Sequence, residues 1–194
     1  MPASTNHKQK KREGEKEMRK LLLVGLSGVV LTFFVPAARA QFVDQMNYLG
    51  PHIGLSGVGS ALTLGLDYER GITTPGQVGP GIIGIGGLFD YYSYGDAGLG
   101  GNWTYIDIGV SGMYHFVLSD KQWDPFLGLV LGYEAASWSW NSNYNGLGLA
   151  SPTAGGFTLG GSAGVRYFFD NHWAAQARVG FGFYVLALGV DYSF

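Results

Sequence analysis

Large apolar side chains alternate with small or polar ones along most of this chain. In the last eleven residues, YVLALGVDYSF, an aromatic or aliphatic side chain occupies every second position from Tyr184 to Phe194, with Gly189 and Asp191 among the residues between them. Successive side chains of a β-strand point to opposite faces, so a period of two predicts a strand with one apolar face. The chain therefore ends in a predicted strand.

Seven further segments repeat this alternation, and clusters of Gly, Asn, Asp, Ser and Pro separate them. We expect eight strands, near residues 48–57, 61–71, 81–92, 103–117, 123–139, 156–169, 173–182 and 184–194. Residues 94–102 are a predicted Gly-rich loop, and residues 140–155 are the longest predicted loop. Trp138 and Trp140 break the alternation at the end of the fifth segment, which predicts a β-bulge there.

The N-terminal residues indicate export. Residues 18–40 hold two basic residues, then an apolar run over 21–35, then the small-residue sequence Ala38-Arg39-Ala40. This order is typical of a secretory signal peptide, and we predict cleavage before Gln41. The apolar run has about 15 residues, fewer than the roughly 20 that a transmembrane helix needs. Residues 1–17 are very polar, and we interpret them as an extension that results from an upstream start codon chosen in error.

The chain after residue 40 is acidic and has no cysteine. Eight of the 12 Lys and Arg residues and three of the 14 Asp and Glu residues precede residue 41, which leaves a net charge of about −7 (4 − 11). The four remaining basic residues are Arg70, Lys121, Arg166 and Arg178. So few basic groups exclude a surface that neutralises nucleic-acid phosphates. Without cysteine, an exported protein gains no stability from disulfides.

Residues 41–194 are predicted to form one domain. Their number, 154 (194 − 40), suffices for eight strands of roughly 10 to 12 residues, the smallest common size of a membrane β-barrel. The charged residues of the strands fall opposite the apolar set, and a charge costs several kcal/mol in hydrocarbon but can be paired in a lumen. A soluble barrel with a ligand cavity would alternate likewise, but its exterior would need more charge than four basic residues supply. We therefore predict an all-β fold, an eight-stranded antiparallel up-and-down transmembrane β-barrel. Its predicted interior polar residues are Asp67, Glu69, Asp90, Asp107, His115, Glu134, Arg166, Gln176, Arg178 and Asp191.

Aromatic residues gather near the predicted strand ends, as in the interfacial girdles of membrane proteins. One predicted girdle comprises Tyr68, Phe116, Phe126, Tyr167, Trp173 and Phe194, and the other comprises Tyr91, Trp103, Tyr105, Trp138, Phe157 and Tyr184. An even number of strands puts both termini on the periplasmic side. The loops near residues 57–60, 93–102, 140–155 and 182–183 then face outward from the cell.

Residues 41–194 resemble the small eight-stranded outer-membrane β-barrels, the OmpA-like and OmpX-like group. The resemblance rests on strand number, length and the terminal GVDYSF, which is similar to the signal that the barrel-assembly machinery recognises. It implies a place in the outer membrane of a Gram-negative cell envelope and an assembly role for Tyr192 and Phe194. The implied partners are outer-membrane lipid, lipopolysaccharide, periplasmic chaperones and the assembly machinery, and the implied state is a monomer. The peptidoglycan-binding domain of full-length OmpA-type proteins is not found after the barrel, so a cell-wall tether is not expected.

The interior charges leave two functions open. Barrels of eight strands are narrow and fill with side chains, so Arg166 and Arg178 are expected to pair with Glu134, Asp107 or Asp191 in a salt-bridged core. The excess of carboxylates instead favours a narrow, porin-like path for cations or other small solutes. The first reading predicts a non-enzymatic barrel whose surface loops contact the environment.

A lipid-modifying enzyme is the third possibility, because some barrels of this size act on lipid A with serine, histidine and an acid. Ser56 with His52, and Ser111 with His115, have suitable residue types. Residues four apart on one strand lie about 13 Å from each other, too far for a hydrogen bond. We predict no catalytic residues.

No metal-ligand cluster or phosphate-binding loop is found in the sequence, so neither a metal nor a cofactor is expected. The sequence WSWNSNYNG, residues 138–146, begins the longest predicted loop. Trp and Tyr beside Asn and Ser make good contact residues, so Trp140, Asn141 and Tyr144 are the candidate surface-loop residues. The alternative is an aromatic girdle that ends in a solvated loop.

Overall fold

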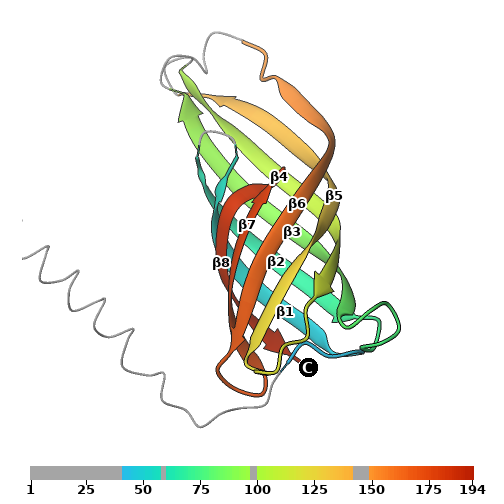
Figure 1. Cartoon of the computed structure of the whole chain (residues 1–194). Coiled ribbons are helices and arrows are strands. Elements are labelled where there is room, and N and C mark those ends of the chain that lie inside the picture. Colours follow the sequence, from blue (N-terminus) through green and yellow to red (C-terminus); the bar gives the residue numbers. More distant parts are fainter. Residues whose placement is uncertain (1–40, 58–59, 97–99, 142–148) are drawn as a thin grey trace, which may run out of the picture. The chain divides into compact units, whose positions relative to one another are not determined.

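Eight antiparallel strands form a closed barrel in this computed structural model, which describes residues 41–57, 60–96, 100–141 and 149–194. Neighbours in the chain are neighbours in the barrel, and β1 pairs with β8 to close it (Figure 1). The strands are β1 (Asn47–Ser56), β2 (Leu62–Gly71), β3 (Ile82–Asp96), β4 (Gly101–His115), β5 (Trp123–Trp140), β6 (Thr153–Phe168), β7 (Trp173–Phe181) and β8 (Tyr184–Ser193). The predicted fold class and strand number are confirmed. The predicted signal peptide and the extension before it lie outside the described residues.

The wall of the barrel has an apolar outer face and a polar inner face. On β4, the Ile108 side chain is 62% exposed, whereas its neighbour Asp107 is fully buried. A water-soluble protein would bury the isoleucine and expose the aspartate, so the barrel is inverted relative to a soluble one. This arrangement is the one that a lipid-facing barrel requires. Among the described residues, no helix is both long and apolar enough to span a membrane.

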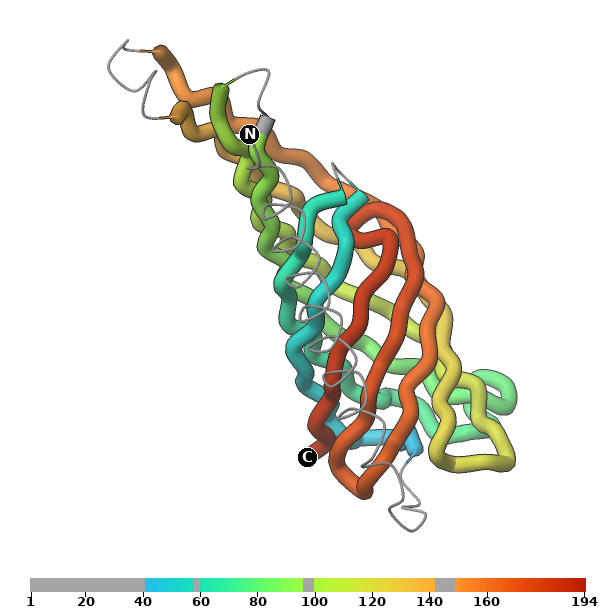
Figure 2. The backbone as a smooth tube through the Cα atoms, turned by 90° about the vertical axis from the view of Figure 1, so that its left-hand side faces the viewer, coloured from blue at the N-terminus to red at the C-terminus, as the bar shows by residue number. Residues whose placement is uncertain are grey.

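The strands differ in length. β1, β2, β7 and β8 have nine or ten residues, whereas β3 to β6 have 15 to 18. A tilted strand of about 9 to 11 residues crosses the hydrocarbon, so the extra residues of β3–β6 rise beyond it at the end away from the C-terminus. Figure 2 shows these strands projecting well past the red β7–β8 hairpin.

Two predicted loops are shorter in the structure. β3 and β4 pair as far as Asp96 with Gly101, so most of the predicted Gly-rich loop 94–102 is strand. Glycine content suggested a loop, but the backbone hydrogen bonds continue. β6 likewise begins at Thr153, earlier than the predicted 156, so 12 residues, 141–152, connect β5 and β6.

The predicted bulge at Trp138 is wrong. β4 pairs with β5 without a register shift from Gly101–Trp140 to His115–Phe126. Trp138 is only 5% exposed, because it occupies an inward position of a regular strand. The described irregularity lies instead between β1 and β8, where the register shifts after Leu55, and Tyr184 consequently turns inward.

The predicted girdles are partly wrong for the same reason. Trp103, Tyr105, Trp138, Tyr184 and Phe126 occupy inward positions, because the sequence shows how close an aromatic residue is to a strand end but not which face it occupies. The predicted aromatic residues on the outer face are Tyr68, Tyr91, Phe116, Phe157, Tyr167, Trp173 and Phe194.

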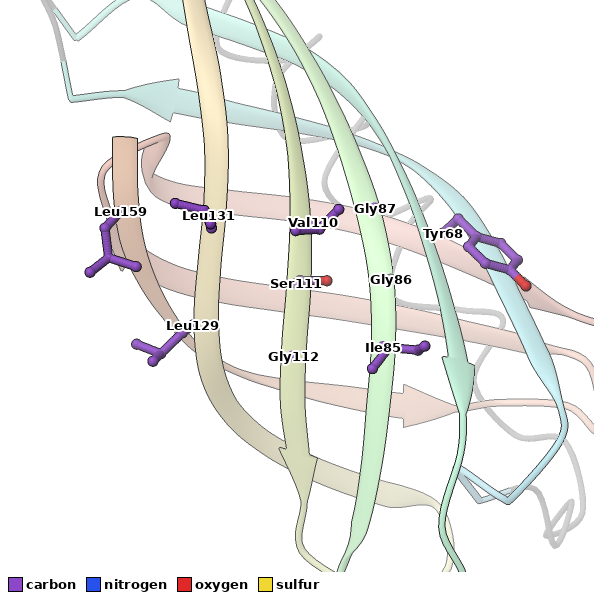
Figure 3. Close-up of a pocket in the computed structure, with 10 residues that line it drawn as sticks. All are labelled: Tyr68, Ile85, Gly86, Gly87, Val110, Ser111, Gly112, Leu129, Leu131 and Leu159. Atoms are coloured by element: carbon purple, nitrogen blue, oxygen red, sulfur yellow. The ribbon is translucent and has the colours of Figure 1, made fainter. Parts of the chain in front are cut away.

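The outer face has a shallow apolar hollow of about 680 Å³ across β2 to β6. Gly87 and Gly112 leave it unfilled, and Ile85, Val110 and Leu129 line it (Figure 3).

Candidate functional site: the charged interior

The structure places all ten predicted polar residues at inward positions of the strands. Glu134 is half-buried and the other nine are buried: Asp67, Glu69, Asp90, Asp107, His115, Arg166, Gln176, Arg178 and Asp191. Two ionisable residues that were not among the ten, His52 and Asp124, are buried with them. The period of two in the sequence predicts an inward position for both residues. Asp124 is an even number of positions from Glu134 on β5, and His52 is two positions from Gly50 and from Gly54 on β1.

Arg166 on β6 is the centre of a cluster near the C-terminus. Its Nε donates to Asp191 Oδ2 at 2.5 Å, and its Nη2 donates to Glu69 Oε2 at 2.6 Å. Its Nη1 lies 3.5 Å from Asp124 Oδ2. Gln176 Nε2 donates to the other oxygen of Asp191 at 2.9 Å. These residues and His115 form what we call the Arg166 cluster, which ties strands together across the lumen.

His115 joins the Arg166 cluster from β4. Its Nε2 lies 2.7 Å from Glu69 Oε1, and its Nδ1 lies 2.9 Å from Asp124 Oδ1. Because an imidazole donates from both nitrogens only when protonated, this geometry fits an imidazolium. Phe42 stacks on the His115 ring, with centroids 3.6 Å apart. The buried charges are thus paired and covered by aromatic rings, which offsets their desolvation.

A second cluster, centred on Arg178 of β7, lies further from the C-terminus. Arg178 donates twice to Asp67 of β2, once from Nη1 at 3.0 Å, and its guanidinium lies 5.0 Å from the Tyr184 ring centroid. His52 of β1 bridges two carboxylates, with Nδ1 2.6 Å from Asp67 Oδ2 and Nε2 2.6 Å from Asp90 Oδ1. Arg178, Asp67, His52 and Asp90 form the Arg178 cluster.

Phe183 fills the lumen beside the Arg178 cluster. It follows Gly182, whose φ of +100° turns the chain between β7 and β8, and its side chain is 2% exposed. A Cβ placed on Gly132 of β5 would lie 2.7 Å from Phe183 Cζ, so the ring reaches across to the opposite wall. Leu88 and Val130 belong to the same buried apolar group. The space left between the two clusters is only about 10 Å³, no more than one water needs.

A row of three carboxylates lies just beyond this apolar layer. Asp90, Asp107 and Glu134 are direct partners on β3, β4 and β5, each two positions further out than Leu88, Gly109 and Gly132. We call these three residues the acidic row.

The ion pairs predicted for Arg166 and Arg178 were partly wrong. Arg166 does bind Asp191, but neither arginine pairs with Asp107 or Glu134. Arg178 binds Asp67 instead, and Asp107 and Glu134 lie two positions further out than Gly109 and Gly132.

The two serine–histidine pairs do not form a catalytic arrangement. Both nitrogens of His52 face Asp67 and Asp90, and both nitrogens of His115 face Glu69 and Asp124. A general base needs a nitrogen within hydrogen-bond reach of its serine, and these nitrogens are occupied by carboxylates. Within the described part of the chain, no group of three or more His, Cys, Asp and Glu residues is arranged to hold a metal ion.

Two of the three candidate surface-loop residues can be placed. Trp140 ends β5, and its indole Nε1 donates to the Ala150 carbonyl at 2.9 Å, so it closes the base of the loop. Asn141 is exposed, and its backbone N–H donates to the Gly100 carbonyl at 3.0 Å. Tyr144 lies outside the described residues.

The predicted assembly residues lie on the outer face at the end of β8. Tyr192 packs against Trp173, with centroids 4.9 Å apart. Phe194 exchanges two backbone hydrogen bonds with Asn47, which fixes the C-terminus to the start of β1.

Comparisons with known proteins bear on the fold. No family model matches the chain, and no curated protein matches it. The solved structure of the outer membrane protein OprG from Pseudomonas aeruginosa is similar, with 13% identity over 81% of this chain and 99% of that chain and a TM-score of 0.62. The N-terminal β-barrel domain of Pseudomonas aeruginosa OprF matches with 18% identity over 78% and 98% and a TM-score of 0.50. Ail, the attachment invasion locus protein of Yersinia pestis, matches with 13% identity over 78% and 100% and a TM-score of 0.50.

At these identities the likeness concerns the fold. The chain has the closed eight-stranded fold of the small outer-membrane β-barrels, the group that its sequence resembles.

Proposed function

We propose that this protein is a non-enzymatic barrel of the bacterial outer membrane, closed to solutes, whose tall β3–β6 wall and its loops meet the environment. The observation that carries this proposal is the filled lumen. The Arg166 and Arg178 clusters leave about 10 Å³ between them, which excludes a hydrated ion, and Phe183 is buried in the lumen as well. The occupied histidine nitrogens support a role without catalysis.

The proposed location and partners rest on the outer face. Ile108, Val110, Leu129 and many similar residues form an apolar surface that lipid and lipopolysaccharide would cover. The C-terminal strand, with Tyr192 and Phe194 turned outward, would be presented to the barrel-assembly machinery. A closed barrel has no free sheet edge within the membrane, so a monomer suffices.

A pore for cations is the second candidate, and the acidic row favours it. Planar-bilayer conductance of the protein purified from outer membranes tests both, after its gel mobility shifts on heating as a closed barrel's does. Silence over a wide voltage range is expected. Steady cation-selective openings that change when Glu134 or Arg166 is neutralised would make the protein a pore.

The loop role needs a separate test. Deleting residues 142–148 leaves β5 and β6 intact, because the strands end at Trp140 and begin at Thr153. Reduced adhesion or stress tolerance of cells that carry the shortened protein supports a loop function. Unchanged behaviour, with normal amounts of folded barrel, limits the role to the barrel itself.

A further inference from the structure

The inner face of the barrel carries more negative than positive groups. Among the described strand residues, four basic side chains face seven carboxylates even if both histidines are protonated, an excess of three (7 − 4). The basic residues are His52, His115, Arg166 and Arg178, and the carboxylates are Asp67, Glu69, Asp90, Asp107, Asp124, Glu134 and Asp191. The Arg166 cluster has three carboxylates for two basic residues, and the Arg178 cluster has two for two, so Asp107 and Glu134 of the acidic row account for two of the three excess charges.

The acidic row brings like charges together. Asp107 is the direct partner of Asp90 on one side and of Glu134 on the other, which places their Cβ atoms about 5 Å apart. Like charges directly opposite each other destabilise a sheet. His52 compensates Asp90, and the Tyr92 hydroxyl donates to Glu134 Oε2 at 3.1 Å, but no charge of the opposite sign reaches Asp107 or Glu134 among the described side chains.

Buried polar atoms beside the row have no partner in the described part of the chain. They are both carboxylate oxygens of Asp107, Oδ2 of Asp90 and Oγ1 of Thr63. All three residues are fully buried, and Thr63 is the direct partner of Tyr92, one inward position above Asp90. Buried acceptors without donors are costly, and the atoms beside the row are acceptors and one hydroxyl. Further out, the indole Nε1 of Trp138 is a buried donor that also has no partner in the described part of the chain. The arrangement calls for a ligand that donates several hydrogen bonds and carries positive charge.

Aromatic rings cover the inner wall beyond the row. Tyr92 and Tyr105 stack with centroids 4.7 Å apart, and Trp103 meets Trp138 edge to face at 5.3 Å. Trp103, Tyr105 and Glu134 are half-buried, so this wall is reached from the outer end of the barrel. Phe183 packs with Leu88 and Val130 in the buried apolar group on the other side of the row. An apolar stem can therefore lie on the rings while its charged end reaches Glu134.

We propose that the acidic row and the rings of Tyr92, Tyr105, Trp103 and Trp138 bind a primary ammonium ligand with an apolar stem, an alkylamine or diamine. A primary ammonium carries one charge and three donors, which match Glu134, Asp107 and their neighbours. The alkyl stem packs on the aromatic rings, where cation–π attraction adds to the contact. This site is distinct from the proposed closed lumen, and binding at it does not require conduction.

Titration of the purified, folded protein with 1,4-diaminobutane tests the proposal, with tryptophan fluorescence and the thermal unfolding midpoint as readouts. We expect saturable binding that changes the fluorescence and raises the midpoint. 1,4-Butanediol has the same stem without the charges and is expected to have no effect. Equal effects of the diol, or of sodium or calcium ions at the same ionic strength, overturn the assignment of an ammonium site.

Two variants locate the binding. Asp107→Asn and Glu134→Gln keep side-chain shape and remove charge, and each is expected to weaken diamine binding by about tenfold or more, as loss of a charge-assisted hydrogen bond does. Asp107→Asn also removes like-charge repulsion, so the variant should fold at least as stably as the parent. The matched control is Asp120→Asn, an exposed acid in the turn between β4 and β5. Binding that is absent from the parent, or unchanged in both row variants, refutes the proposal.

Discussion

Arg166 and Glu69 are 97 positions apart in the chain, and their side chains meet inside the barrel, with Arg166 Nη2 2.6 Å from Glu69 Oε2. The bond joins β6 to β2, two strands that are not neighbours in the sheet. Hydrogen bonds between neighbouring strands close the wall, whereas this ion pair crosses the lumen. The Arg166 cluster therefore links β2 and β6 across the lumen, and removal of Arg166 should lower the stability of the barrel.

Arg166→Met is expected to lower the free energy of unfolding by about 3–5 kcal/mol, because it leaves the carboxylates of Glu69, Asp124 and Asp191 without their shared cation. Denaturant unfolding followed by tryptophan fluorescence measures the change. Arg70→Met is the matched control, since Arg70 is exposed on β2, and it should change stability by less than about 0.5 kcal/mol. Equal stabilities of the two variants would show that the cluster contributes nothing.

Gly65 on β2 has no side chain, which leaves space for the side chains of His52 and Asp90. A Cβ at this position would collide with the His52 ring and with Asp90 Oδ1. We expect Gly65→Ala to cost about 1–3 kcal/mol by overpacking. Gly112→Ala on β4 has nothing within 4 Å of the new Cβ and should be neutral or slightly stabilising. If the Gly65→Ala and Gly112→Ala proteins are equally stable, the His52 and Asp90 side chains can move aside without a loss of stability.

Much of this interior could be predicted from the sequence, and its pairing could not. A period of two reveals the face of each residue, and that placed Asp107, Arg178 and Asp191 inside. It does not reveal the height at which residues of different strands meet, which depends on the register. Arg178 therefore met Asp67 rather than Asp107 or Glu134.

The faces of aromatic residues were harder to predict than those of charges. Hydrocarbon excludes a charge from the outer face, but an aromatic ring suits either face. Trp138 and Tyr105 therefore looked like girdle residues and lie on the inner wall. Tyr184 turned inward because of a register shift at Leu55, which no local pattern marks.

Val110 tests the lipid-facing wall. Its side chain is exposed in the middle of β4, where the neighbouring residues are Ile108 and Gly112. Val110→Lys should cost about 2–4 kcal/mol in a bilayer if this position lies near the midplane. Asn102→Lys, at the outer end of the same strand, should cost about 1 kcal/mol or less. Unfolding from lipid vesicles measures the change in stability of both variants. A small cost for Val110→Lys would show that Val110 lies outside the hydrocarbon core of the bilayer.

The C-terminal residues are predicted to act in assembly more than in stability. Phe194→Ala keeps both backbone hydrogen bonds with Asn47 and removes an exposed ring. We expect less folded barrel in the outer membrane of cells, with little change in the unfolding midpoint of the purified protein. Phe157→Ala, which removes another exposed ring on the outer face, on β6, is the control. Equal losses in both variants would assign the effect to general apolarity rather than to a terminal signal.

Phe183 fills the lumen beside Gly132, so Phe183→Ala tests whether ion pairs alone close the lumen. Removing the ring opens a cavity beside Gly132, and water that enters it adjoins the carboxylates of Asp107 and Glu134. We expect a small, cation-preferring conductance in planar bilayers, together with a loss of stability of about 3–5 kcal/mol. Phe181→Ala removes the same ring two residues earlier, on the lipid-facing side, and should stay silent. If Phe183→Ala is folded and also silent, the Arg166 and Arg178 clusters seal the barrel by themselves.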